Sequence, residues 1–203
     1  AGTAVTTAPS VVVRDAGNNP VANVDITFTV TGGAGVVVPG AVVKTNAQGI
    51  AAATSWTLGA TAGANSLSAA ASGLSSVTFS ATGIAGSAAR LTKYLGDAQS
   101  ATVNTAVAIA PSVRITDINN NPVGAGTSVT FAVTGGGGSI TGPATVLTNA
   151  SGIATIGGWV LGASAGANTL SATSGTLLGS PGVFTATGTA QVPASVTVVA
   201  GNT

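Results

Sequence analysis

The sequence predicts an all-β protein made of two tandem β-sandwich domains arranged end to end. The stretch Trp56–Ala69 (W-T-L-G-A-T-A-G-A-N-S-L-S-A) recurs 103 residues later as Trp159–Ala172, so one structural unit is used twice. Segments such as Val24–Thr31 alternate apolar and polar residues, which is typical of a half-buried strand. The chain is also rich in Gly, Thr, Ser and Val, a composition that favours many short strands joined by turns.

The repeat sets the expected domain boundaries within the 203 residues. We place the first domain at 1–88 and the second at 89–193, and each is long enough for one modest sandwich core. The short segment Ile84–Ala89 is the expected linker, and it contains no long run of Gly, Ser or Pro. Residues 194–203 are expected to be the opening strand of a next repeat or a donor strand.

Alternation predicts the strands and the core of each domain. The last two strands are expected at Asn65–Ala71 with Val77–Thr82, and at Asn168–Thr173 with Val183–Thr187. The segments Val36–Val43 and Ile140–Leu147 are each interpreted as two short strands paired around a proline-containing turn. Alternation along the strand before the repeat places Ile50, Ala52, Thr54, Trp56 and Leu58 on one face. The predicted core residues are Phe28, Phe79, Phe131, Phe184, Trp56, Trp159, Leu67 and Leu170.

The composition excludes several functions. Charged residues are only 4% of the chain and the net charge is +1, so no basic surface for nucleic acid is expected. No run of 18 apolar residues occurs, so no membrane span is expected in this chain. Without His, Cys or Glu, and with only Asp15, Asp25, Asp97 and Asp117 as carboxylates, we expect no enzyme activity, no cofactor and no metal site.

Two features have both a binding and a structural interpretation. The matching segments Asp15–Val21 and Asp117–Val123 could be metal loops, but one carboxylate among amides favours a turn. Trp56 and Trp159 could stack on a carbohydrate, but their equivalent places in both repeats favour the core.

The two ends of the chain are expected to differ from a complete repeat. The second domain begins with a predicted strand, Leu91–Leu95, and nothing equivalent precedes Ala1, so the first domain is expected to lack its opening strand. The terminal segment aligns with Arg90–Leu95 and would be that strand for another unit. The predicted polymer-contact residues are therefore Ser195, Val196, Thr197, Val198, Val199 and Ala200.

Four motifs in fixed order carry a family resemblance. They are D-x-x-N-N-P-V, F-x-V-T-G-G, T-N-A-x-G-I-A and W-x-L-G-x-x-A-G-A-N-x-L-x-A, and the order occurs twice. Together they resemble the bacterial immunoglobulin-like domains of the invasin/intimin type over nearly the whole chain. The resemblance implies sandwiches without the antibody disulfide, used in tandem on the bacterial cell surface, where most copies are stalk modules.

Three functions remain open from the sequence. The chain could be a non-catalytic structural module of an extracellular stalk, adhesin array or fibre, with adjacent Ig-like repeats as its partners. It could instead be a subunit of a self-polymerising filament, in which residues 194–203 of one copy join the first domain of the next, head to tail. A carbohydrate- or host-binding module is the third possibility, and the sequence names no ligand for it.

Overall fold

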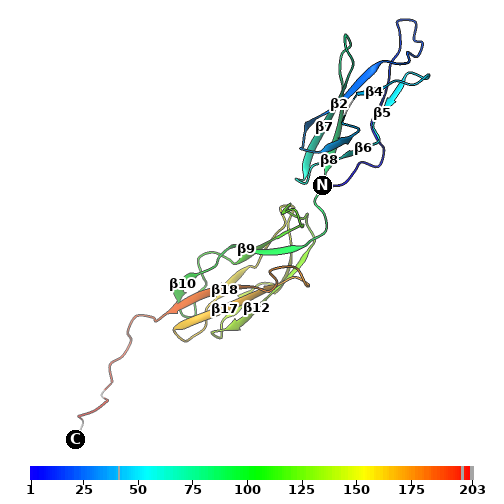
Figure 1. Cartoon of the computed structure of the whole chain (residues 1–203). Helices are drawn as coiled ribbons and strands as arrows, with labels where there is room; N and C mark the ends of the chain where they lie inside the picture. The colour runs from blue at the N-terminus through cyan, green and yellow to red at the C-terminus, as the bar shows by residue number, and fades with distance from the viewer. Residues whose placement is uncertain (41, 198, 202–203) are drawn as a thin grey trace. The chain divides into compact units, whose positions relative to one another are not determined.

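A computed structural model describes residues 1–40, 42–197 and 199–201, and the described residues form strands and no helix. These residues divide into two compact units. Unit 1 contains Ala1–Gly86 and Ile118–Asn121, and unit 2 contains Ser87–Asp117 and Pro122–Thr203. Each unit is built from facing β-sheets, as Figure 1 shows, so the predicted all-β sandwich fold is confirmed. The described residues contain no helix that is long and apolar enough to cross a membrane.

Unit 2 packs a five-stranded sheet against a three-stranded sheet, with a short two-stranded ribbon beside them. The larger sheet has the order β10 (Gln99–Thr102), β18 (Gly182–Thr189), β17 (Gly166–Thr173), β12 (Ser128–Gly135) and β14 (Thr145–Leu147). In this sheet β10 lies parallel to β18, and the other neighbours are antiparallel. The other strands are β15 (Ile153–Thr155), β11 (Ser112–Thr116) and β9 (Arg90–Leu95), with the ribbon of β13 (Ser139–Thr141) and β16 (Gly158–Val160).

Unit 1 repeats this plan with fewer strands among its described residues. Its larger sheet has four strands, in the order β4 (Val42–Lys44), β2 (Asp25–Gly32), β7 (Gly63–Ala70) and β8 (Val77–Gly83). The remaining strands form two pairs: β1 (Ser10–Val12) with β5 (Ile50–Ala52), and β3 (Val36–Val38) with β6 (Ser55–Thr57). The expected pairing of the last two strands is confirmed in both units, as β7 with β8 and β17 with β18.

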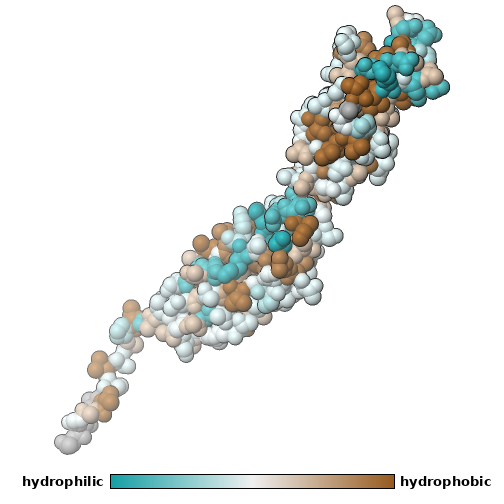
Figure 2. Space-filling view, in the orientation of Figure 1, coloured by the Kyte–Doolittle hydropathy of each residue, from teal (hydrophilic) through white to brown (hydrophobic). Residues whose placement is uncertain are grey.

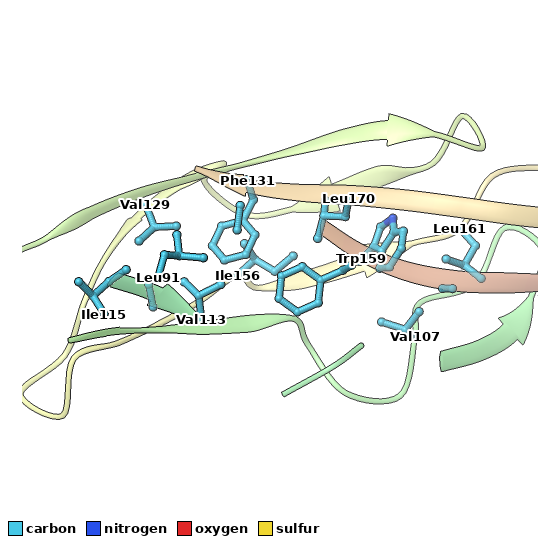
Figure 3. Close-up of a cluster of buried hydrophobic side chains, with 14 of the residues drawn as sticks. Leu91, Val107, Val113, Ile115, Val129, Phe131, Ile156, Trp159, Leu161 and Leu170 are labelled. Atoms are coloured by element: carbon cyan, nitrogen blue, oxygen red, sulfur yellow. The ribbon is translucent and has the colours of Figure 1, made fainter. Parts of the chain in front are cut away.

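The cores lie where alternation places apolar residues between the sheets. In β2, Ile26 and Phe28 are buried while Asp25, Thr27 and Thr29 are exposed, and β12 has the same pattern around Phe131. Figure 3 shows the unit 2 core, in which Phe131, Leu170 and Trp159 are part of one buried cluster. Seven of the eight predicted core residues are buried, and Phe79 packs against the unit 1 core while partly exposed. The core prediction is therefore confirmed.

The predicted hairpins at Val36–Val43 and Ile140–Leu147 are wrong. Strand β3 pairs with β6, whereas β4 pairs with β2 in a different sheet, and unit 2 repeats this with β13 and β14. The proline-containing segment therefore carries the chain from one sheet to another. Alternation alone could not distinguish a turn within one sheet from a crossing between two, because both join short strands.

The single face predicted for Ile50 to Leu58 is also wrong in its first half. Ile50 is exposed and Ala51 and Ala53 are buried, whereas Trp56 and Leu58 are buried as expected. The chain leaves its partner β1 after Ala52 and joins β3 at Ser55, with Thr54 N–H donating to the Val38 carbonyl at 2.6 Å. This change of partner reverses the alternation, since a shift by one residue moves every side chain to the other face.

Candidate functional site

The repeated stretches Trp56–Ala69 and Trp159–Ala172 have a structural role in both units. Asn65 Oδ1 accepts a hydrogen bond from Gly59 N–H at 2.9 Å, and Asn65 Nδ2 donates to the Gly63 carbonyl at 3.1 Å. Asn168 makes the same two bonds, to Gly162 N–H at 2.9 Å and the Gly166 carbonyl at 3.2 Å. Both asparagines are buried, and their side-chain amides stabilise the turn that precedes β7 or β17.

The turn also requires the glycine that follows the leucine of the repeated motif, which is Gly59 in unit 1 and Gly162 in unit 2. A Cβ at Gly59 would overlap the Gly33 carbonyl oxygen, and a Cβ at Gly162 would overlap that of Gly136. The glycine-rich runs after β2 and β12 therefore lie against this turn. They are part of the packing of each unit.

The T-N-A-x-G motif is a second structural turn. Thr45 Oγ1 accepts from Val24 N–H at 2.9 Å and donates to the Val21 carbonyl at 2.8 Å. Asn46 Oδ1 accepts from Gln48 and Ile50 N–H groups, at 2.9 and 3.0 Å. The equivalent Thr148 and Asn149 of unit 2 make the matching bonds, as shown by their contacts with Thr127, Gly124, Ser151 and Ile153.

The segment Asp15–Val21 forms a tight turn. Asp15 Oδ1 accepts from Asn19 N–H at 2.8 Å, and Asn18 adopts the left-handed conformation at φ +67°. Asn19 donates hydrogen bonds to the Asp15 carboxylate from its backbone and from its side chain, and together they hold the pKa of that carboxyl below its ordinary value. In the described residues no three His, Cys, Asp or Glu side chains gather as a metal site would require. Trp56 and Trp159 are buried at 2% and 0% exposure, so neither presents a ring face for stacking on a sugar.

The two units differ along one edge of the sandwich. Backbone bonds align the two units: Val5 N–H donates to the Trp56 carbonyl and Val107 N–H to the Trp159 carbonyl, each at 2.9 Å. Ala1 therefore corresponds to Val103, the residue after β10. The described residues of unit 1 contain no counterpart of β9 and β10.

In unit 2 the strand β9 closes the core at this edge. It runs antiparallel to β11, with Leu91 opposite Ile115, and Leu91 is only 3% exposed. Figure 3 shows Leu91 among Val113, Ile115 and Val129. Leu91 N–H donates to the Leu178 carbonyl at 2.9 Å, so the strand is held on both sides.

After β9 the chain crosses to the other sheet through Gly96, Asp97 and Gln99. A Cβ at Gly96 would lie 2.7 Å from Pro111 Cα, so only glycine fits there at its φ of +85°. Asp97 Oδ1 accepts from Thr185 N–H at 2.9 Å. Partial burial alone would raise the pKa of Asp97, but hydrogen bonds from Lys93, Thr185 and Ala98 outweigh it and keep that pKa below its ordinary value.

Two hollows mark the matching places in unit 1. One, of about 220 Å³, lies beside Val11, Val13, Ile26 and Val77, where unit 2 places Leu91. The other, of about 370 Å³, is lined by residues that correspond to the surroundings of Gly96–Gln99, among them Thr7, Pro9, Trp56, Phe79 and Ser80. We call the two hollows together the unit 1 groove.

The groove leaves part of the unit 1 core partly exposed. Val113, Ile115 and Phe184 are fully buried in unit 2, whereas their counterparts Val11, Val13 and Phe79 are only partly buried. Figure 2 shows apolar surface over the β7–β8 part of unit 1. Among the described residues β1 pairs only with β5, so its other edge has free backbone groups that favour strand addition.

The predicted polymer-contact residues form no strand where they are described. Ser195, Val196, Thr197, Val199 and Ala200 are exposed, and Val198 lies outside the described residues. Val196 and Val199 are 101% and 95% exposed. The structure thus brings them to no partner. Gly201 has φ +86°, close to the +85° of Gly96, with which it aligns in sequence.

One residue of the groove was not predicted from the sequence. Strand register shows that Val77 corresponds to Gly182, because Val77 pairs with Ala69 and Gly182 with Ala172. The hairpin before this position is two residues longer in unit 2, which displaces the simple repeat offset. Comparing the lengths of the two hairpins in the sequence would have revealed that Val77 corresponds to Gly182.

No family model and no curated protein matches the chain. Solved structures similar to it include the D0–D1 domain of intimin, at 20% identity over 90% of this chain and 85% of that chain, with a TM-score of 0.34. Invasin, a bacterial integrin-binding protein, has 21% identity over 92% of this chain and 36% of its own, with a TM-score of 0.39. The Escherichia coli adhesin FdeC has 20% identity over 93% of this chain and 60% of its own, with a TM-score of 0.46.

Two of these structures are of intimin and invasin, the proteins after which the family that the four motifs resemble is named. The similarity is one of fold. This chain spans about a third of invasin and three fifths of FdeC, so the activities of those whole proteins are not assigned to it.

Proposed function

We propose that this chain is a non-catalytic structural module of an extracellular bacterial surface protein, in which Ig-like units follow one another in a stalk, adhesin array or fibre. One observation carries the proposal. The repeated polar residues, which would be the first candidates for a binding site, make the same internal hydrogen bonds in both units. A unit repeated with its internal packing intact is the pattern of a structural repeat.

The surface supports the same proposal. The net charge is +1, and the ion pairs Lys44–Asp25 and Lys93–Asp97 both lie at the surface. Such a surface offers little electrostatic attraction to an acidic or basic partner. The sequence has no Cys, so neither unit depends on disulfides or on the redox state of its compartment.

Mechanical unfolding and ligand binding test this proposal together. We expect the intact chain, pulled from its ends, to unfold in two separate events, and to bind nothing on arrays of glycans and host matrix proteins. Specific, saturable binding to one glycan or host protein would favour a carbohydrate- or host-binding module instead. A single unfolding event for the whole chain would contradict two independent structural units.

The unit 1 groove favours a second candidate function, assembly of copies of the chain head to tail into an extracellular filament. Residues 194–203 would pair with β1 of the next copy, as β9 pairs with β11 inside unit 2. A contact between two different surfaces does not close on itself, so it would build a fibre. Sedimentation of the intact chain over a range of concentrations tests it: growing oligomers are expected, and a monomer at every concentration would overturn it.

A further inference from the structure

The opening segment of unit 2, residues 90–102, is one continuous stretch held by two different sheets. It runs first as β9, which pairs antiparallel with β11, and then as β10, which pairs parallel with β18. In Figure 1 the beginning of β9 and the arrowhead of β18 lie at opposite ends of unit 2. A pull along the chain therefore reaches unit 2 through the opening segment on one side and through the end of β18 on the other.

Such a pull loads the β10–β18 pair in shear. The pair runs from Gln99 opposite Ala186 to Thr102 opposite Thr189, and Val103 N–H donates to the Thr189 carbonyl at 3.0 Å. Because the strands are parallel, force applied before β10 and after β18 acts in opposite directions along the same axis. The evenly spaced bonds of a parallel ladder are then strained together, whereas peeling would break them one at a time.

The Asp97 carboxylate extends this ladder past the beginning of β10 and also joins it to β9. Its Oδ1 accepts from Thr185 N–H at 2.9 Å, and Thr185 directly precedes the first β18 residue that pairs with β10. Its Oδ2 accepts from the ammonium group of Lys93 in β9. Lys93 Nζ also lies 5.9 Å from the centre of the Phe184 ring in β18. Hydrogen bonds between ionised groups are stronger than neutral ones, so this carboxylate ties β9 firmly to β18.

The side chain of Gln99 fixes the same crossing from the other side. Its Nε2 donates to the carbonyls of Gly96 and Ile109 at 2.8 and 2.7 Å, and its Oε1 accepts from Ile109 N–H at 2.8 Å. The amide thus pairs with the Ile109 backbone as a neighbouring strand would. Since Ile109 comes shortly before β11, the chain between β9 and β10 is bound to both sheets. Neither strand can slide along its partner without breaking these side-chain bonds.

We propose that Asp97, with its partners Lys93 and Thr185, is a mechanical clasp that makes β9 and β10 separate from unit 2 together when the chain is under tension. The inference deepens the first proposed function and rests on it, since tension along the chain is what a stalk or fibre module experiences. An interaction that lasts until the opening segment separates slows unfolding, and forced unfolding is governed by the unfolding rate.

Unfolding of the intact chain under constant force, held by its two ends, tests the clasp. The unit 2 event is recognised by the greater length of chain it releases, because Ser87–Thr189 is longer than Ala1–Gly86. In Asp97→Ala, unit 2 should unfold about tenfold faster at the same force, because a charge-assisted hydrogen bond is lost from the step that limits unfolding. Asp97→Asn can still accept from Thr185 but loses the ion pair with Lys93, so its rate should lie between. The unit 1 event should keep its rate in both variants.

Thr148→Val is the matched control, because it removes two buried hydrogen bonds, to Thr127 N–H and the Gly124 carbonyl, near β14. Strand β14 is at the opposite edge of the five-stranded sheet from β10. The control should lower the urea midpoint of unit 2 and leave its unfolding rate under force nearly unchanged.

Two results would overturn the clasp and leave the structural module standing. One is an unchanged unit 2 rate in Asp97→Ala, with two separate unfolding events still present. The other is a faster rate in both Asp97→Ala and Thr148→Val, in proportion to their losses in urea, which would make Asp97 an ordinary stabilising contact. If Asp97→Ala does not fold, Asp97→Asn decides in its place, and a rate equal to that of the unchanged chain overturns the clasp. A single event for the whole chain would contradict the structural module itself.

Discussion

The two units share a plan and differ along one edge, where unit 2 has β9 and β10 and the described part of unit 1 has a groove. The turns that carry the repeated motifs are the same in both, down to the hydrogen bonds of Asn65 and Asn168. The cores are not equally covered: among the described residues the buried apolar cluster contains nine residues in unit 1 and 15 in unit 2. The difference teaches that the motifs specify the turns, while the opening strand completes the core.

The largest expected effect is a difference in stability between the units. Because apolar burial is the main favourable term in folding, unit 1 should unfold at a clearly lower urea concentration than unit 2. Backbone amide spectra recorded through a urea titration report each unit separately. Loss of both sets of signals at one urea concentration would show that the groove costs unit 1 little.

A matched pair of core substitutions sharpens the comparison. Phe184→Ala should lower the free energy of unfolding of unit 2 by ~3–5 kcal/mol, and Phe79→Ala should cost unit 1 clearly less, because Phe79 is already partly exposed. Phe131→Ala and Phe28→Ala are the controls. Those two phenylalanines are equally buried, and both substitutions should cost about 3–5 kcal/mol. Denaturant melts giving equal losses for Phe79 and Phe184 would contradict the groove.

The repeated turns should respond alike. Asn65→Ala and Asn168→Ala each leave a buried backbone N–H of Gly59 or Gly162 without its acceptor, which costs about 1–3 kcal/mol. The two losses should agree within the error of the urea melts. A large difference between them would mean that the turns are less equivalent than their hydrogen bonds indicate.

A small effect is expected on the stability of unit 2 at acidic pH, through the Asp97 carboxylate. The pKa of Asp97 is lower in the folded state than its unfolded value of about 3.9, so its stabilising effect is complete above that value and is lost as the pH falls through the folded-state pKa. Urea midpoints of unit 2 measured at pH 7 and pH 3 should differ less in Asp97→Asn than in the unchanged chain. Asp25→Asn, on the exposed face of unit 1, should leave the unit 2 difference as it was.

The repeat, the all-β class and most of the core could be predicted from the amino-acid sequence alone. The eight-residue strands around Phe28 and Phe131 alternate clearly enough to choose the buried face, because side chains point to opposite sides of a strand in turn. The opening strand of unit 2 was also predictable, since Leu91–Leu95 precedes a segment that has a copy in unit 1.

The pairing of the short strands and the lining of the groove could not be predicted from the sequence, because both depend on contacts between distant segments. The sheet crossing between β3 and β4 and the reversed alternation before Trp56 depend on which backbone partner each short strand meets. The match of Val77 with Gly182 depends on hairpin register, which a difference of two residues in the preceding loop hides from a fixed repeat offset. Local sequence sets the face of a strand, whereas partners distant in the chain set its register and its neighbours, and these are fixed only when the sheets assemble.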